Sequence, residues 1–222
     1  MPRAQNEIIR LGLVDSQQIL LESLCHRFNE FSDMQVAMTA TAAETAVPLI
    51  GETAPDILLL DVDLPDQNGF EVLEAIRQES PLTRVILLTD FVSDIFIEQA
   101  LRHDVKCYLT KSVPFDQLVQ CIRRVREGHV FFCDEVNDRL EFNPHIGKPT
   151  VKSRNAIVSL TNRQLEVLRY LALGASVKEV ATSMQISEKT VDSHKYRIMQ
   201  KLGIHDRVHL ARFAIREGLV MP

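Results

Sequence analysis

The chain has 222 residues, 45% of them hydrophobic and 25% charged, which is the composition of a globular protein with a buried core. It contains no run of 18 or more apolar residues and does not begin with the basic and apolar regions of a signal peptide, so we expect a cytoplasmic protein with no membrane partner. The net charge of −5 is unevenly distributed: residues 1–147 carry 24 acidic and 12 basic side chains, whereas residues 148–222 carry 6 and 13, which makes the C-terminal part a candidate for contact with nucleic-acid phosphates.

The first 128 residues alternate between short apolar runs and amphipathic stretches, which is the pattern of βα units around a parallel sheet. The expected strands cover residues 8–14, 34–38, 56–60, 84–88 and 106–109. The expected helices cover residues 18–31, 42–50, 69–78, 93–102 and 115–127. This alternation predicts one doubly wound, flavodoxin-like α/β domain with a five-stranded parallel sheet.

Beyond this domain the pattern changes. Residues 129–158 lack sustained periodicity and are rich in asparagine, proline, glycine and basic residues, so we predict a linker with a short helix near residues 135–141. Helical patterns then return, with interruptions at Gly174, near Ile186 and at Gly203. The predicted organisation is a first domain over residues 7–128, a linker over residues 129–158 and a small all-helical domain over residues 159–222.

The four cysteines, Cys25, Cys107, Cys121 and Cys133, stand far apart beside apolar neighbours. They form no CxxC pair, and no histidine lies near them at the spacing of a metal site. We therefore expect four buried free thiols.

Three of the expected strands end at side chains that suit the handling of a phosphoryl group, namely Asp61, Thr89 and Lys111. Parallel strands present their carboxyl ends at one edge of a sheet, where open α/β sheets bind ligands. A carboxylate can accept a phosphoryl group while a hydroxyl and an ammonium contact its oxygens. The pattern favours Asp61 as a phosphate acceptor over the alternative that it only caps a turn.

Residues 7–128 resemble the receiver domain of two-component response regulators. The resemblance rests on Asp15, Asp61, Pro65, Gly69, Thr89, Tyr108 and Lys111. It implies that Asp61 is the phosphoacceptor, that a sensor histidine kinase is a partner, and that acidic side chains hold Mg²⁺, with Asp15, Asp61 and Asp63 as candidates. It also implies that Thr89 and Tyr108 couple the phosphoryl group to the output surface.

The chain departs from the receiver pattern beside the predicted metal. Receivers usually carry two adjacent acids after the first strand, whereas here Ser16 follows Asp15. A hydroxyl is a weaker ligand for Mg²⁺ than a carboxylate, and Asp63 is expected to restore part of the missing charge. Asp90 stands where a small residue is usual and is expected to crowd the phosphate entrance. Two interpretations stay open: a receiver controlled by phosphorylation at Asp61 with weakened metal binding, and a phosphorylation-independent receiver.

The third helix of the tail, which follows Ser187 and runs to Leu202, completes a predicted helix-turn-helix. Val191 and Ile198 belong to its inward stripe. The remaining surface offers basic and hydrogen-bonding side chains: Lys189, Thr190, Asp192, Ser193, Lys195, Tyr196, Arg197, Gln200 and Lys201. In the major groove of double-stranded DNA the basic side chains meet phosphates and the small polar ones reach base edges. From these residues alone, an ordinary solvated helix face is an equal alternative.

Residues 160–219 resemble the LuxR-type helix-turn-helix, in positions that include Leu160-Thr161, Lys178-Glu179-Val180-Ala181, Thr190-Val191 and Gly218-Leu219. A receiver followed by this motif resembles the NarL/FixJ group of response regulators. The resemblance implies a DNA-binding transcription regulator that forms a homodimer. It also implies that the last helix makes the dimer contact, with several apolar residues partly exposed: Val208, Leu210, Ala211 and Ala214.

Two other functions are alternatives to a regulator without enzymatic activity. Leu60-Asp61-Val62-Asp63 is an apolar strand that ends in DxD, as in phosphatases and phosphotransferases of the haloacid-dehalogenase type, although Pro65 stands where that family has threonine or valine. The second alternative is a protein-interaction adaptor that has lost DNA binding.

Overall fold

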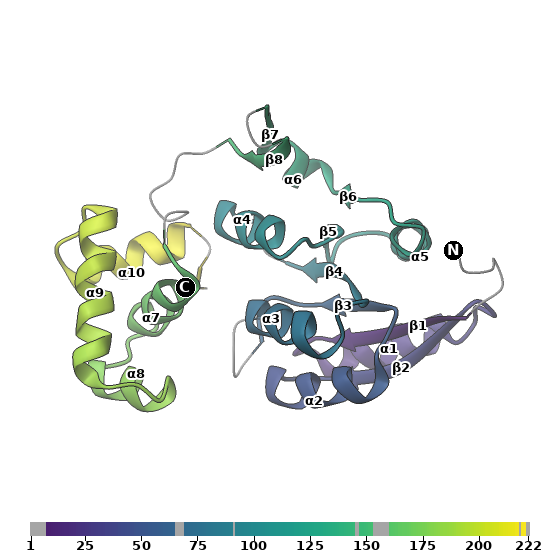
Figure 1. The fold of residues 1–222 in the computed structure, drawn as a ribbon, viewed down its shortest axis with the longest axis horizontal. Coiled ribbons are helices and arrows are strands. Elements are labelled where there is room, and N and C mark those ends of the chain that lie inside the picture. The colour runs from purple at the N-terminus through teal and green to yellow at the C-terminus, as the bar shows by residue number, and fades with distance from the viewer. Residues whose placement is uncertain are drawn as a thin grey trace. The chain divides into compact units, whose positions relative to one another are not determined.

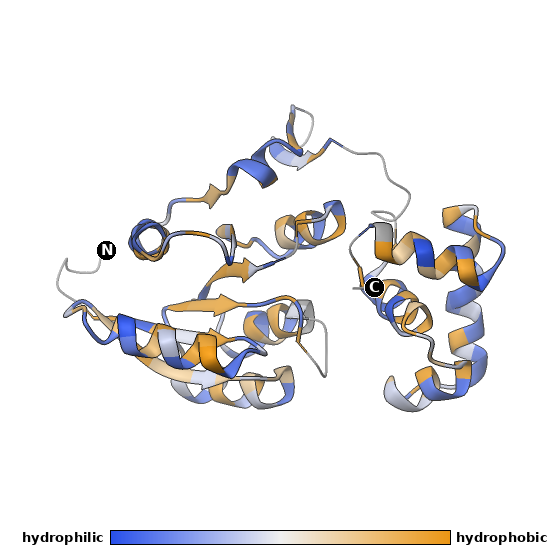
Figure 2. Cartoon of the chain, turned by 180° about the vertical axis from the view of Figure 1, so that it is seen from behind, coloured by the Kyte–Doolittle hydropathy of each residue, from blue (hydrophilic) through white to orange (hydrophobic). Residues whose placement is uncertain are grey.

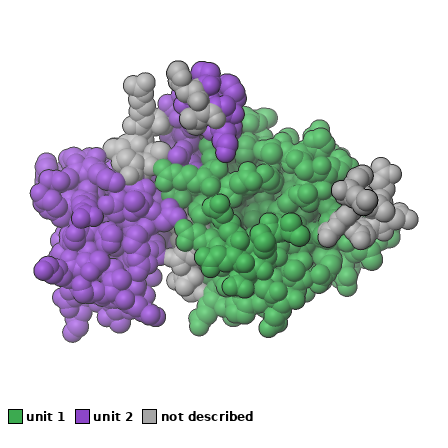
Figure 3. All heavy atoms as spheres, viewed as in Figure 1, with its two compact units in different colours: residues 1–91, 99–138 green, residues 92–98, 139–222 purple. Residues whose placement is uncertain are grey.

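The computed structural model describes residues 8–64, 69–90, 92–144, 147–152, 160–217 and 219–220. The chain divides into two compact units (Figures 1 and 3). The N-terminal unit comprises residues 1–91 and 99–138, and the C-terminal unit comprises residues 92–98 and 139–222. No helix within the described ranges is both long and apolar enough to span a membrane.

The N-terminal unit is a doubly wound α/β domain around a parallel sheet, as the sequence predicts. Its strands are β1 (Ile9–Val14), β2 (Met34–Ala40), β3 (Ile57–Leu60), β4 (Arg84–Thr89), β5 (Cys107–Thr110) and β6 (Phe131–Phe132). They lie in the order β2-β1-β3-β4-β5-β6 and all pair in parallel. The helices that alternate with them along the chain are α1 (Gln18–Phe28), α2 (Ala43–Thr53), α3 (Gly69–Glu79), α4 (Asp94–Arg102) and α5 (Phe115–Arg126), and residues 94–98 of α4 are grouped with the C-terminal unit. The predicted count of five strands is corrected to six.

Successive side chains of a strand point to opposite faces, so the sheet has two apolar faces. Each face is buried by a different set of helices. On one face Leu11, Ile57 and Ile86 belong to an apolar cluster that also contains buried residues of α1 and α5. Figure 1 shows α2 and α3 in front of the other face. Strands buried on both faces are continuously apolar, and Figure 2 shows the central strands in the hydrophobic colour.

The predicted linker contains regular structure. β6 is followed by α6 (Asp134–Asn137), close to the predicted short helix. An antiparallel hairpin of β7 (Leu140–Asn143) and β8 (Lys148–Val151) comes next. The remainder of the predicted linker, residues 153–158, lies outside the described residues.

The described part of the C-terminal unit ends in four helices, α7 (Asn162–Ala172), α8 (Val177–Ser183), α9 (Glu188–Leu202) and α10 (Arg207–Arg216). Side-chain oxygens at each N-cap satisfy backbone N–H groups of the first turn, which fixes where each helix starts: Thr161, Ser176, Ser187 and Asp206. Gly203 ends α9 with a left-handed φ of 64°, a conformation that glycine adopts without steric cost. Leu160, Leu168, Val180 and Val191 lie among the buried residues of the shared core.

Candidate functional site

Two buried carboxylates stand at the point where the strand order reverses. β1 lies between β2 and β3. The chain therefore passes to one side of β1 through α1 and to the other side of β1 through α2. Asp15 follows β1 and Asp61 follows β3, and their exposed fractions are only 4% and 3%. The backbone N–H of Asp61 donates to the carbonyl of Val14 at 2.8 Å, which keeps the two strand ends together. Ligands of doubly wound sheets bind at such a switch point.

Lys111 joins these carboxylates. Its Nζ lies 2.8 Å from Oδ2 of Asp15 and 2.7 Å from Oδ2 of Asp61, and the three side chains are nearly enclosed. The backbone N–H of Lys111 donates to the carbonyl of Thr89 at 3.1 Å, so the ends of β4 and β5 also meet here. The structure thus brings together the three strand-end residues that the sequence singles out.

The electrostatics of this triad favour a retained positive charge on Lys111. Burial alone lowers the pKa of Lys111, but hydrogen bonds to Asp15 and Asp61 outweigh it and the pKa is raised above its ordinary value. Burial raises the pKa of Asp15 despite its hydrogen bonds to Lys111 and Gln17. One ammonium between two carboxylates leaves a single negative charge in the pocket when all three groups are ionised.

Each carboxylate also accepts a backbone N–H through its second oxygen. Gln17 donates to Oδ1 of Asp15 at 2.8 Å, and Asp63 donates to Oδ1 of Asp61 at 3.1 Å. The side chains of Ser16 and Asp63 are exposed to solvent. Within the described ranges no group of three or more His, Cys, Asp and Glu side chains is arranged as a metal site. The cation that Asp15 and Asp61 share in the structure is the ammonium of Lys111, and Asp63 lies exposed at the rim of the pocket.

The other predicted switch residues are buried. Thr89 and Tyr108 have no exposed surface, and Tyr108 pairs with Leu87 in the register of β4 and β5. Asp90, predicted to crowd the entrance, is exposed. Pro65 lies outside the described residues.

Gly69, the first residue of α3, lies against the backbone that carries Asp61. A Cβ added at Gly69 would stand 2.5 Å from the carbonyl oxygen of Asp61 and 2.8 Å from Cα of Val62. Neither atom can move without shifting the end of β3. Only a glycine fits at this close approach of two backbone segments.

We expect Gly69→Ala to lower the free energy of unfolding by about 1–3 kcal/mol, because the added methyl group forces the backbone around Asp61 to shift. Gly51→Ala is the control, since a Cβ at Gly51 meets only the Glu79 side chain at 3.7 Å or more. Alanine also favours helix over glycine, so the control should keep or raise stability. Urea denaturation of both variants measures the difference, and equal stabilities would contradict the close-approach explanation.

The candidate DNA-binding residues lie on α9. Val191 and Ile198 of this helix are fully buried, while the side chains predicted to contact DNA are exposed, except for Lys195, which is half-buried. Tyr196 is 63% exposed, and its hydroxyl oxygen accepts a hydrogen bond from Gln200 at 2.8 Å. The helix therefore turns a basic and hydrogen-bonding face to solvent.

Two predicted DNA contacts also bond within the protein. The ammonium of Lys201 donates to Oε1 of Gln164 at 3.0 Å, and the same oxygen accepts the backbone N–H of Thr161 in the capping box of α7. The hydroxyl groups of Thr190 and Ser187 lie 2.8 Å apart at the start of α9. These bonds fix α9 relative to α7 and fix its first turn.

Sequence reasoning gave no role to two arginines that brace the helices. Arg163 donates to the carbonyl of Met184 at 2.7 Å, in the turn between α8 and α9, and also bonds Glu166. Arg207 donates to the carbonyl of Ala175 at 2.8 Å, before α8. No local pattern in the sequence marks these two contacts, because the carbonyl partners, Met184 and Ala175, are far away along the chain.

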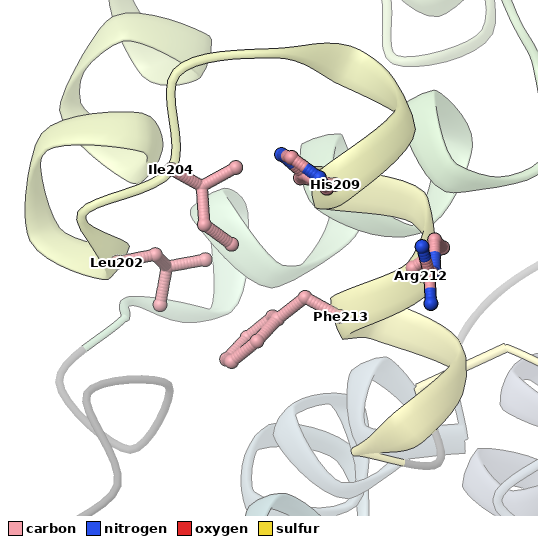
Figure 4. Close-up of a pocket in the computed structure, with 5 residues that line it drawn as sticks. All are labelled: Leu202, Ile204, His209, Arg212 and Phe213. Atoms are coloured by element: carbon pink, nitrogen blue, oxygen red, sulfur yellow. The ribbon is translucent and has the colours of Figure 1, made fainter.

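The last helix differs in part from its prediction. Val208 is 68% exposed as expected, whereas Leu210 and Ala214 are buried in the core of the unit. α10 has to cover α7, and these two residues form its inward face. A pocket lies beside α10 (Figure 4), lined by Leu202, Ile204, His209, Arg212 and Phe213.

Comparisons with known proteins assign each half of the chain to a known domain family. Residues 11–123 match the response regulator receiver domain, and residues 158–214 match bacterial regulatory proteins of the luxR family. The uncharacterized transcriptional regulatory protein YxjL of Bacillus subtilis is 30% identical over 212 residues, which cover 96% of this chain and 97% of YxjL. The oxygen regulatory protein NreC of Staphylococcus aureus is 29% identical over 96% of this chain and 99% of its own length.

A solved structure of RcsB from Salmonella enterica serovar Typhimurium, bound to promoter rprA with the phosphomimetic BeF3, shares the fold. Its TM-score is 0.70 at 20% identity, over 93% of this chain and 98% of that one. The family matches and the full-length relatives together identify the protein class: the chain belongs to the response regulators that join a receiver domain to a LuxR-type DNA-binding domain.

Proposed function

We propose that the chain regulates transcription by inserting α9 into the major groove of double-stranded DNA, under control of phosphorylation at Asp61. The observation that carries the DNA part is the solvent-exposed face of α9 between Lys189 and Gln200. Arg197 and the lysines supply charge for phosphates, while Ser193 and Asp192 are short enough to reach base edges. The excess of basic over acidic side chains in residues 148–222 also supports DNA as the partner.

The acidic pocket supports the phosphorylation part. Asp61 supplies the carboxylate that accepts the phosphoryl group, and Lys111, already 2.7 Å away, exchanges its bond to Asp61 for one to a phosphoryl oxygen. Mg²⁺, held by Asp15 and Asp61 with Asp63 at the rim, would supply neutralising charge. Thr89 donates to the phosphoryl group from the end of β4. Tyr108 is buried beside β4, which suits a side chain that couples phosphorylation of Asp61 to the output surface.

The alternative is a receiver that works without phosphorylation. Ser16 leaves the pocket with one carboxylate fewer than a usual receiver, and Lys111 already neutralises part of the charge there. Both features reduce the attraction for a divalent cation. This alternative keeps the same DNA-binding function.

Replacing Ser16 by aspartate is expected to strengthen Mg²⁺-dependent binding of beryllium fluoride about tenfold, because it adds a further carboxylate beside Asp15 and Asp61, and carboxylates are the ligands that this cation prefers. Isothermal titration calorimetry measures the affinity. Ser16→Asn serves as the control, since it adds similar volume without charge. Equal affinities of the wild type and Ser16→Asp would mean that the missing acid does not limit metal binding.

The proposed partners follow from these two sites. A sensor histidine kinase supplies the phosphoryl group to Asp61. The chain acts in the cytoplasm, because that is where a regulator meets genomic DNA. Exposed apolar side chains at Val208 and Leu173, together with the pocket beside α10, support a homodimer through the C-terminal unit. We assign no catalytic turnover, and p-nitrophenyl phosphate hydrolysis would reveal the DxD phosphatase alternative.

Selection of duplexes from fragmented genomic DNA tests the proposal. We expect the immobilised full chain to enrich sequences with two related half-sites about 10 bp apart, the spacing at which a symmetric dimer reads one face of DNA. Enrichment should disappear at high salt, because phosphate contacts release counterions. No enrichment under any salt or phosphoryl-donor condition would favour the adaptor alternative.

A further inference from the structure

Asp192 is an acidic side chain on α9, the helix proposed to enter the major groove. It is the fifth residue of this helix and is exposed to solvent. Within the described part of the chain, its carboxylate takes part in no salt bridge and accepts no hydrogen bond from another side chain. A carboxylate in the groove repels the DNA phosphates, so it weakens binding unless a base donates a hydrogen bond to it.

Asp192 begins a row of three side chains along α9. Residues four apart are neighbours on a helix surface, so Tyr196 and Gln200 continue the row over the next two turns. Both are exposed, and the amide of Gln200 donates to the hydroxyl oxygen of Tyr196 at 2.8 Å. Lys189 stands in the first turn, before the row begins. The row therefore offers hydrogen-bonding atoms and carries no positive charge of its own.

Basic side chains lie on both sides of this row. Each residue advances about 100° around an α-helix, which places Lys195 on one side of the row, next to the buried stripe of Val191 and Ile198, and Arg197 and Lys201 on the other side. The major groove has a matching arrangement, because base edges form its floor and the phosphates of the two strands border it. When α9 lies in the groove, the row faces the bases and the basic side chains face the phosphates.

We propose that Asp192 determines sequence specificity by accepting a hydrogen bond from the amino group of a cytosine in each half-site. This inference rests on the proposed insertion of α9 into the major groove and adds the base that the helix reads. The hydrogen-bond donors in the major groove are the amino groups of cytosine and adenine. A carboxylate has acceptor oxygens alone, so the acceptors of guanine and thymine repel it.

The atoms beside each donor separate cytosine from adenine. The adenine amino group lies between two acceptors, N7 of the same base and O4 of the paired thymine. The cytosine amino group has an acceptor on one side only, O6 of the paired guanine. The carboxylate of Asp192 therefore meets one repelling atom at a C·G pair and two at an A·T pair, which favours cytosine.

Selection from randomised duplexes by the full chain tests this assignment. The wild type is expected to enrich cytosine about tenfold over the other bases at one position of each half-site. Asp192→Ala should lose the preference at that position alone. Asp192→Asn should select adenine there, because the asparagine amide accepts from N6 and donates to N7 of adenine. Asp192 is exposed, so both substitutions leave the core of the unit intact.

Glu188→Gln is the matched control. Glu188 is exposed in the first turn of the same helix and lies outside the row. Its substitution changes an acid to an amide, as Asp192→Asn does, but removes no proposed base contact. We expect the control to bind all duplexes somewhat more tightly, because a charge that repels phosphates is lost, and to select the same bases as the wild type. Fluorescence anisotropy with duplexes that carry each of the four bases at the selected position measures these preferences.

The outcomes separate this inference from the proposed function on which it rests. A change from cytosine to adenine in Asp192→Asn that is absent from Glu188→Gln would establish the role of Asp192. A selected motif that neither Asp192 variant alters, or whose altered position holds a base other than cytosine, would overturn that role and leave DNA binding by α9 in place. If the wild type enriches no motif at all, the base assignment and the proposed function are both contradicted.

Discussion

Replacing Lys195 and Arg197 by alanine is expected to weaken binding to every duplex about 100-fold, because each lost phosphate contact contributes about 1–3 kcal/mol at moderate salt. The slope of log affinity against log salt should become shallower by about 1.8, since each phosphate contact contributes about 0.9. Fluorescence anisotropy with labelled duplexes at several salt concentrations measures both quantities. The double variant keeps Val191 and Ile198, so the core of the C-terminal unit is untouched.

A charge-matched control separates groove contact from the overall field of the protein. Lys106→Ala with Arg124→Ala removes the same two charges from the N-terminal unit. This control should change the affinity less than threefold and leave the salt slope unaltered. Equal losses in both double variants would mean that α9 does not dock in the groove.

Replacing Lys111 by methionine is expected to lower the free energy of unfolding by about 3–5 kcal/mol at neutral pH, because two buried carboxylates would lose their shared cation. The pH dependence has a definite sign. Burial already raises the pKa of Asp15, and removal of the Lys111 ammonium raises it further above that of the unfolded chain, so the folded state binds more protons. The loss of stability should therefore be greatest at neutral and alkaline pH and diminish as acid protonates Asp15.

Urea denaturation between acid and alkaline pH measures this dependence. Lys111→Arg is the control, since it retains the positive charge beside Asp15 and Asp61 and should keep most of the stability. The variant Asp15→Asn with Lys111→Met should recover part of the loss by removing one of the two facing charges. A loss in Lys111→Met that does not vary with pH would contradict the electrostatic explanation.

The sequence predicts the positions of the main helices and strands well, because the pattern of apolar residues follows burial closely. The strands β1, β3, β4 and β5 consist mostly of apolar residues, and they end where Asp15, Asp61, Thr89 and Lys111 meet. N-caps can likewise be recognised in a sequence, because Thr161, Ser176 and Ser187 each accept a backbone N–H from a residue only three positions later.

Features that depend on distant partners were not predictable. β6 is only two residues long, so it has no periodicity, and only its pairing with Cys107 and Tyr108 defines it. The bridge from Lys111 to both carboxylates joins three strand ends and has no local signal. Burial of Leu210 and Ala214 likewise depends on how α10 packs on α7.

The central claim is that phosphorylation of Asp61 controls binding of DNA by α9. Anisotropy with a selected duplex, measured for the wild type and Asp61→Asn with and without acetyl phosphate and Mg²⁺, tests it directly. We expect the donor to tighten binding of the wild type about tenfold, within the usual range of coupling between two sites, and to leave Asp61→Asn unchanged. Equal affinity of the wild type with and without the donor would contradict this claim and establish the phosphorylation-independent alternative.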